Sequence, residues 1–292
     1  MPDLTAFCEK APALHVLNLR ITQHSRLIAS RDWDIDCRRN IYSASKSVTA
    51  VAVGLAQSEG LLSLDERLVD AFPDDLPCCV SDNLRLATVR DLLTMCLGQA
   101  SGQLMAAQRP RYTETDWVRL ALSFPFADPP GTRFVYSNVG PYLAGVLVQR
   151  RAGMNLVDYL MPRLFEPLGI LRPTWETDPQ GMTFGAGGLM LTADELHRFG
   201  QMCLEDGCWQ GRRLVPGDWL RACMSRQAEN GTPHGYGYLF WSGPGDAFRA
   251  DGMYGQLSII DRKKDAVVTV LCENRDGKAL FDALENDVLS QL

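Results

Sequence analysis

Apolar residues near the N-terminus fall into two patterns, and each pattern predicts a different kind of element. Residues 14–21 and 26–30 are apolar-rich runs separated by a short polar break, which is typical of a β-hairpin. From Val48 to Ala56 the apolar residues recur at helical spacing, and Gly60 follows. This spacing predicts a buried helix over about 43–59.

The middle of the chain has a helical period punctuated by proline and glycine. Between residues 61 and 181 the pattern predicts a block of helices, at about 89–95, 115–122, 140–151 and 156–164. Beyond this block, Thr192 is followed three residues later by Glu195, a capping-box pattern that predicts one more helix, ending near residue 205.

The C-terminal part returns to extended runs. Residues 236–241, 255–261 and 266–272 are separated by turn residues and predict an antiparallel meander, before a final helix at about 278–289. The sequence thus predicts an α+β fold, in which an antiparallel sheet built from both chain ends is flanked by helices and an all-helical region is inserted.

Composition and charge narrow the class of protein. The 292 residues carry a net charge of −6 with both signs mixed along the chain, which argues against nucleic acid as a partner. The nine cysteines lack paired C-x-x-C spacing, and the four histidines are not paired at helical spacing, so we expect reduced thiols and no metal or cofactor. No apolar run is long enough to span a bilayer and no signal peptide is visible, so we expect a cytoplasmic protein without a membrane partner. The sequence leaves the oligomeric state open.

Ser43 and Lys46 are the first candidates for chemistry. They lie three residues apart at the start of the predicted apolar helix, so their side chains share one face. A serine hydroxyl needs a base to become a good nucleophile, and burial can lower the pKa of a lysine enough for it to act as that base. Only five of the 29 basic residues are lysines, and Lys46 is isolated from the others. The alternative is that Ser43 caps the helix and Lys46 is solvated.

Two further segments place polar side chains or glycines in loops between predicted elements. Tyr136 and Asn138 follow a short extended run before a helix, where alternate residues face the same way. Both side chains could face one cleft. Alternatively, Tyr136 is a core residue and Asn138 is the N-cap of the helix. The segment from Ala250 to Gln256 contains Gly252 and Gly255, which would let the backbone approach a ligand closely, or which form a plain turn.

In this order and at these separations, the three segments resemble the motifs of the serine β-lactamase and penicillin-binding-protein superfamily, whose first motif is S-x-x-K. The branch that is most similar contains class C β-lactamases with their esterases, amidases and D-amino-acid peptidases. Segments such as Phe165-Glu-Pro-Leu-Gly-Ile and Gly187-Gly-Leu-Met-Leu-Thr-Ala-Asp-Glu-Leu are also typical of it. The pattern divides the chain into a sheet region at 1–60 and 182–292 and a helical region at 61–181. The resemblance implies that the two form one catalytic unit, with the active site in the cleft between them.

The resemblance also implies roles for particular residues. Ser43 would be acylated and Lys46 would be its proton partner. Tyr136 would share the role of general base, with its phenolate favoured by Lys46, and would protonate the leaving group. Asn138 would bind the substrate and orient Lys46, and the N–H groups of Ser43 and Met253 would form the oxyanion hole.

The third segment departs from the family pattern in a way that bears on the substrate. The family usually has Lys or His, any residue, then Gly, whereas this chain has Ala250, Asp251 and Gly252. Without that cation to hold a β-lactam carboxylate, we expect a serine hydrolase acting on a small ester or amide. A β-lactamase, a D-amino-acid peptidase and a non-catalytic acyl sensor remain alternatives. We expect residues 251–254, from Asp251 to Tyr254, to contact the substrate, and Asp251 suggests that the substrate carries a positive amine.

Overall fold

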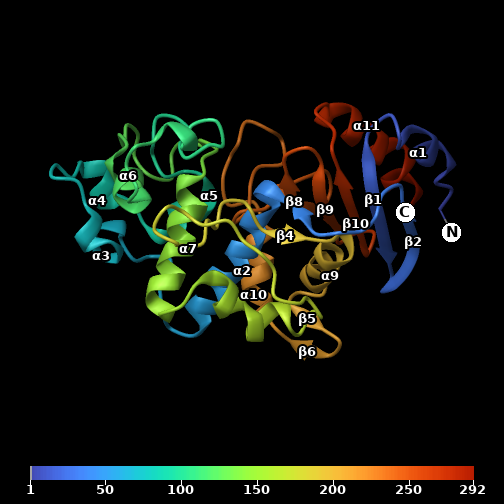
Figure 1. Cartoon of the computed structure of the whole chain (residues 1–292), viewed down its shortest axis with the longest axis horizontal. Helices are drawn as coiled ribbons and strands as arrows, with labels where there is room; N and C mark the ends of the chain where they lie inside the picture. The colour runs from blue at the N-terminus through green and yellow to red at the C-terminus, as the bar shows by residue number, and fades with distance from the viewer. Residues whose placement is uncertain (1) are drawn as a thin grey trace.

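The computed structural model describes residues 2–292 and is built around one six-stranded antiparallel sheet (Figure 1). The strand order is β2-β1-β10-β9-β8-β7, so strands from the two ends of the chain pair in the centre of the sheet. The strands are β1 (Val16–Gln23), β2 (Arg26–Asp32), β7 (Trp241–Ser242), β8 (Ala247–Gly252), β9 (Gln256–Asp261) and β10 (Ala266–Cys272). Two short pairs stand apart: β3 (Arg39–Asn40) with β4 (Met190–Leu191), and β5 (Cys208–Trp209) with β6 (Arg212–Arg213).

Helices cover both faces of this sheet, which explains why β9 and β10 are buried along their whole length. On one face, α1 (Thr5–Lys10) and α11 (Gly277–Asp287) form a separate apolar core with alternate residues of the central strands. On the other face lie α9 (Ala193–Leu204) and α2 (Ser45–Ser58). Residues 45–56 of α2 are all buried, because α2 packs against both the sheet and the helical part of the chain.

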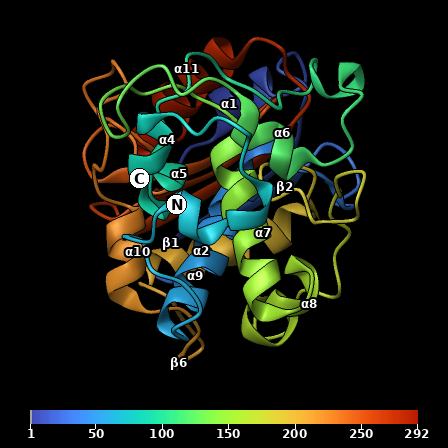
Figure 2. The ribbon, with the colours of Figure 1, turned by 90° about the vertical axis from the view of Figure 1, so that its left-hand side faces the viewer.

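Between α2 and α9 the longer regular elements are helices joined by loops, and most of this part of the chain lies on the left side of Figure 1. Seen from that side in Figure 2, α7 runs through the front of the molecule. The helices are α3 (Leu68–Ala71), α4 (Asp82–Leu86), α5 (Val89–Thr94), α6 (Trp117–Ser123), α7 (Val139–Ala152) and α8 (Leu156–Leu160). This part also contains 3₁₀ turns at Pro73–Asp75 and Arg109–Arg111 and a π-helical turn at Met161–Phe165, and a further 3₁₀ turn at Leu289–Gln291 follows α11. The α+β fold expected from the sequence is confirmed, while the expected boundaries at 60/61 and 181/182 stay a prediction.

The structure corrects the sequence prediction in the C-terminal part. Residues 236–241 were expected to form a strand, but only Trp241–Ser242 belongs to the sheet. The strand missing from the prediction is β8, and its residues Arg249, Asp251 and Gly252 interrupt the apolar pattern that the prediction used. The helix α10 (Gly217–Cys223) was also missed.

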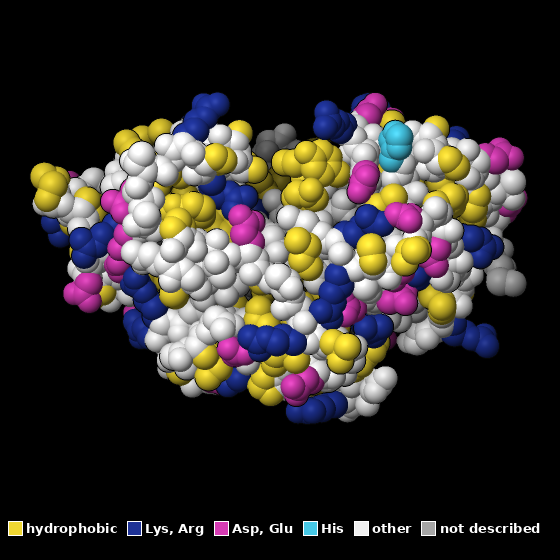
Figure 3. All heavy atoms as spheres, in the orientation of Figure 1, with side chains coloured by type: hydrophobic (Ala, Val, Ile, Leu, Met, Phe, Trp, Pro, Cys, Tyr) yellow, Lys and Arg dark blue, Asp and Glu magenta, His cyan; other side chains and the backbone are white. Residues whose placement is uncertain are grey.

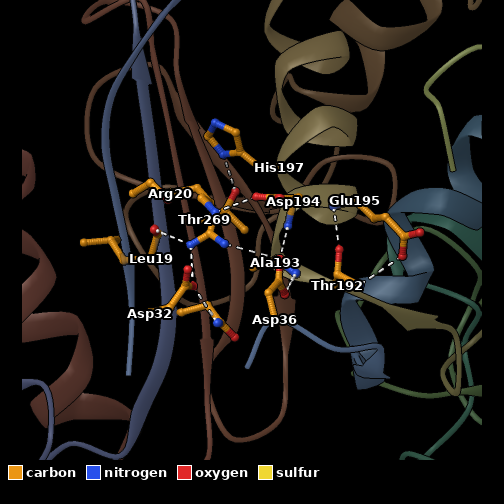
Figure 4. A network of polar contacts seen from close by, with 12 residues as sticks. Leu19, Arg20, Asp32, Asp36, Thr192, Ala193, Asp194, Glu195, His197 and Thr269 are labelled. Carbon is orange, nitrogen blue, oxygen red and sulfur yellow. Dashed lines mark hydrogen bonds and ion pairs between the residues drawn. The ribbon is translucent and has the colours of Figure 1, made fainter. Parts of the chain in front are cut away.

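A polar network centred on the buried Arg20 joins α9 to the sheet (Figure 4). Arg20 of β1 is 5% exposed and forms ion pairs with Asp32, Asp36 and Asp194. Nearby, His197 forms hydrogen bonds with two threonine hydroxyls, and burial lowers its pKa to about 4. This histidine is therefore neutral at pH 7 and serves packing rather than acid-base chemistry.

Several whole-chain features complete the fold. Within residues 2–292, none of the helices has the length and apolar character needed to cross a membrane. All nine cysteines are free. On the face drawn in Figure 3, basic and acidic side chains are interspersed.

Candidate active site

Ser43 lies in a 3₁₀ turn, η1 (Tyr42–Ala44), between β3 and α2. The preceding residue, Tyr42, has a φ of 47°, which is unfavourable for a bulky side chain and costs conformational free energy. Two side chains hold this backbone in place: the Tyr42 N–H donates to Asn40 Oδ1 at 2.7 Å, and Ser45 Oγ donates to the Tyr42 carbonyl at 2.6 Å. The turn that presents Ser43 is therefore fixed by its neighbours before any substrate binds.

Lys46 is the next part of the site, and it is almost completely buried, at 2% exposure. Its Nζ lies 3.0 Å from Ser43 Oγ, 2.7 Å from Asn138 Oδ1 and 2.6 Å from the Ala186 carbonyl oxygen. The solvated lysine that the sequence left open as an alternative is wrong.

Burial lowers the pKa of Lys46 to about 7, and the positive charge of Arg109 acts in the same direction. A large fraction of Lys46 is thus neutral at pH 7. A neutral amine keeps two N–H donors and one lone pair. Because Asn138 and Ala186 offer only acceptors, the lone pair is left for the hydroxyl proton of Ser43. This is the arrangement that a general base requires.

Asn138 precedes α7 and has both ends of its amide in use. Its Oδ1 accepts from Lys46, and its Nδ2 donates to the Leu104 carbonyl oxygen at 2.9 Å. Because one end is fixed by the backbone, the other end is held toward Lys46. This geometry fits the expected role of Asn138 in orienting Lys46. Contact between Asn138 and the substrate stays a prediction, and it would use the second hydrogen on Nδ2.

Tyr136 lies over Lys46, with its ring centroid 5.1 Å from Nζ. The ring stacks on Trp241 at a centroid distance of 5.4 Å. Burial raises the pKa of Tyr136 to about 12. The nearby Ser43 hydroxyl lowers this pKa, whereas the negative charge of Asp251 raises it further. Tyr136 is therefore a neutral phenol at pH 7, whereas the family resemblance implied phenolate character. This protonation state suits a proton donor better than a base.

The third segment lies on β8 and the turn after it. A Cβ atom at Gly252 would lie 2.1 Å from the Ile41 carbonyl oxygen, so only glycine lets β8 approach the backbone that leads to Ser43. The close neighbour of this glycine is the chain itself, and its expected contact with the substrate stays a prediction. The next residue, Met253, is half exposed, and Tyr254 packs its ring edge-on against Tyr42 at 5.3 Å. The expected oxyanion donors, Ser43 and Met253, thus belong to neighbouring backbone segments.

Asp251 is not a free carboxylate. It accepts a hydrogen bond from Arg249 Nε at 2.8 Å, and the Arg249 guanidinium also lies 5.9 Å from the Trp241 ring. Ala250, at the position where the family usually has a cation, is fully buried in the core. A cation is therefore present on β8, one residue before the expected position, and it already neutralises Asp251.

The structure brings Ser43, Lys46, Tyr136 and Asn138 together, with the β8 turn beside them. Sequence reasoning missed the second acceptor for Lys46 at Ala186 and the cation at Arg109. A backbone carbonyl has no sequence signature, and the approach of residue 109 to residue 46 depends on tertiary packing. Within residues 2–292, no group of three or more His, Cys, Asp or Glu is placed to hold a metal ion.

The fold class of β-lactamases and penicillin-binding proteins is defined by an antiparallel sheet with helices on both faces. A serine and a buried lysine lie at the start of a central helix, as they do here. The model of the Beta-lactamase family matches residues 19–290, and the chain belongs to this family.

Similar proteins include enzymes named for hydrolysis. Lovastatin esterase from Penicillium rubens is 32% identical over 150 residues, which is 44% of this chain and 37% of the esterase. The 6-aminohexanoate-dimer hydrolase from Paenarthrobacter ureafaciens is 28% identical over 151 residues, or 47% of this chain and 38% of that enzyme. These alignments thus span well under half of either enzyme. The names support the general class of hydrolases.

A solved structure agrees with the fold over almost the whole chain. A Bacillus anthracis protein assigned as a 6-aminohexanoate-dimer hydrolase superposes with a TM-score of 0.83 at 18% identity. The superposition covers 97% of this chain and 80% of that one. At this level of identity the likeness establishes the fold alone.

Proposed function

We propose that this protein is a serine hydrolase that cleaves a small ester or amide through an acyl-enzyme on Ser43. The observation that carries the proposal is the buried Lys46, whose Nζ is 3.0 Å from Ser43 Oγ and whose pKa is lowered to about 7. A cation that only stabilised the fold would be expected to face a carboxylate, whereas the three partners of Lys46 are all neutral.

The proposed reaction has two steps. Ser43 Oγ attacks the carbonyl carbon while its proton moves to Lys46 Nζ, and the N–H groups of Ser43 and Met253 stabilise the oxyanion. Tyr136 donates its phenolic proton to the leaving group as the bond to the carbonyl carbon breaks, and the proton held by Lys46 restores it. In the second step water attacks the acyl carbon and its proton passes to Lys46. The bond from the acyl carbon to Ser43 Oγ then breaks, and Lys46 returns this proton to Ser43 Oγ, which restores the hydroxyl.

An esterase or amidase is favoured over a β-lactamase because Ala250 occupies the position of the family's usual cation. The relatives named as an esterase and as a 6-aminohexanoate-dimer hydrolase agree with this preference. Arg249 does not restore the missing cation, since it is paired with Asp251.

The test combines turnover with the mass of the intact protein. The protein is incubated with p-nitrophenyl esters of short acids, with nitrocefin and with a fluorophosphonate, in parallel with Ser43→Ala. We expect ester turnover and one covalent label, both lost in Ser43→Ala. Stoichiometric labelling without turnover of any substrate would favour an acyl sensor, and turnover of nitrocefin alone would favour a β-lactamase. Absence of labelling at Ser43 would exclude all three.

A further inference from the structure

A cavity of about 550 Å³ lies next to the segment that carries Ser43. Its wall includes Tyr42, which precedes Ser43 in the chain, and Tyr254, which follows Met253. The rings of these two tyrosines pack edge to face. The cavity therefore begins one residue from the proposed nucleophile and one residue from the second proposed oxyanion donor.

Three arginines line this cavity and differ in how fully their N–H groups are engaged. Arg38 donates to the Glu195 carboxylate and to two backbone carbonyl oxygens, so its charge is paired and few of its N–H donors are free. Arg39 pairs with Asp34, yet its Nε–H is buried without an acceptor in the described part of the chain. Arg275 is exposed and has no ion-pair partner among residues 2–292. The single lining carboxylate, Glu273, lies 3.7 Å from Arg39. Arg38 and Arg39 are thus paired with carboxylates, while Arg275 brings a positive charge that is unpaired among residues 2–292 and Arg39 keeps an unused Nε–H donor.

A buried amide adds a second and independent sign of a polar ligand. Gln256 lines the cavity at 2% exposure, and its Nε2 donates to the Cys272 carbonyl oxygen. That bond fixes which end of the amide faces the backbone. Its Oε1 is then buried without a hydrogen-bond partner within residues 2–292. A buried acceptor without a donor costs free energy, which an N–H or O–H group of a bound molecule would recover.

The position of the cavity indicates which part of a substrate reaches it. The wall is formed by residues around β3 and β4, by η1, and by the turns after β8 and β10. Tyr136 instead stacks on Trp241 of β7. In the proposed mechanism the leaving group faces Tyr136 to receive its proton, so the acyl chain extends on the other side of Ser43. We propose that this cavity binds the acyl part of the substrate and favours acyl groups that end in a carboxylate. The inference rests on the proposed function of Ser43.

Matched esters test the preference. The p-nitrophenyl monoesters of glutaric and adipic acid carry a terminal carboxylate, and the pentanoate and hexanoate esters carry a methyl group in its place. For the native protein we expect kcat/KM to be about tenfold higher for the anionic esters, the size expected for a hydrogen bond to a charged group. Arg275→Gln should remove most of this ratio. Arg212→Gln, an exposed arginine on β6 away from the cavity, should retain both the ratio and the activity.

The outcomes separate this inference from the proposed function. If the native protein cleaves the neutral esters at least as well as the anionic ones, the serine hydrolase stands and the carboxylate preference is overturned. A ratio that survives in Arg275→Gln would overturn the assignment to this cavity.

Calorimetric titration of glutarate into the native protein and into Arg275→Gln gives a measurement that needs no catalysis. If neither class of ester is cleaved, the proposed function fails. Glutarate binding that weakens in Arg275→Gln would then still support the cavity as a carboxylate site, and absence of binding to the native protein would overturn it.

Discussion

Asn138 Oδ1 accepts a hydrogen bond from Lys46 Nζ at 2.7 Å, and this contact joins the start of α7 to the first turn of α2. The acceptor is neutral, so it orients the lysine without stabilising its charged form as a carboxylate would. The low pKa of Lys46 therefore depends on residue 138 being an amide and not a carboxylate.

Replacing that amide by a carboxylate should therefore impair the base. In Asn138→Asp a negative charge would face Lys46, favour its ammonium form and raise its pKa. We expect kcat/KM at pH 7 to fall about tenfold or more and to recover as the pH is raised. Asn286→Asp, on α11 away from the site, is the control for an added charge. An unchanged pH profile in Asn138→Asp would argue against Lys46 as the titrating group.

The native protein should show the titration of Lys46 directly. Because the neutral amine is the active form, kcat/KM should rise about tenfold per pH unit below pH 7 and level off above it. Tyr136, with a pKa of about 12, should not limit the rate between pH 7 and pH 10. A pH series with a p-nitrophenyl ester, corrected for its spontaneous hydrolysis, measures both limits.

Removal of the reacting groups should separate chemistry from folding. We expect Ser43→Ala to abolish turnover, and Lys46→Ala and Tyr136→Phe each to reduce kcat by about 10²- to 10⁴-fold, the usual range for a lost acid or base. Circular dichroism and the melting temperature should show that each variant is folded. Near-normal rates in Lys46→Ala would remove the proposed base.

Arg109 offers a way to change the pKa of Lys46 without touching it. The Arg109 guanidinium pairs with Glu176 and lies 4.5 Å from the Phe184 ring, and its charge lowers the pKa of Lys46. Arg109→Gln should raise that pKa, so the acid limb of the rate profile should move to higher pH while the plateau is retained. Arg111→Gln removes an exposed arginine two residues away and should leave the profile in place. Equal loss of activity at every pH would instead indicate a structural role.

The sequence predicted the chemical core better than its surroundings. Ser43 and Lys46 lie one helical turn apart, so local spacing was enough to pair them. The ion pair between Arg249 and Asp251 escaped prediction because no strand was predicted at residues 247–252, where two charged residues and a glycine obscure the alternation of a strand. Contacts such as that of Lys46 with the Ala186 carbonyl arise from packing between distant segments, which no local pattern encodes.

The ion pair on β8 changes what we expect of Asp251. A substrate amine would have to compete with Arg249, which already donates to the Asp251 carboxylate. We therefore expect Asp251→Asn to leave the preference between amino-substituted and acetylated substrates unchanged. The ratio of kcat/KM for such a pair, in the native protein and in the variant, is the measurement. A preference for the amine that disappears in Asp251→Asn would show that the carboxylate contacts the substrate after all.

Gly252 should be the most sensitive position on β8. In Gly252→Ala the added Cβ would lie 2.1 Å from the Ile41 carbonyl oxygen, so β8 must move away from the turn that holds Ser43. That shift would separate the Met253 N–H from the Ser43 N–H, and loss of one oxyanion donor typically costs about 10²- to 10³-fold in kcat. Gly277→Ala is the matched control, because nothing lies within 4 Å of its added Cβ. We expect a large fall in kcat for Gly252→Ala with a folded protein, and none for Gly277→Ala. Full activity in Gly252→Ala would mean that the spacing between β8 and the Ser43 turn does not set the rate.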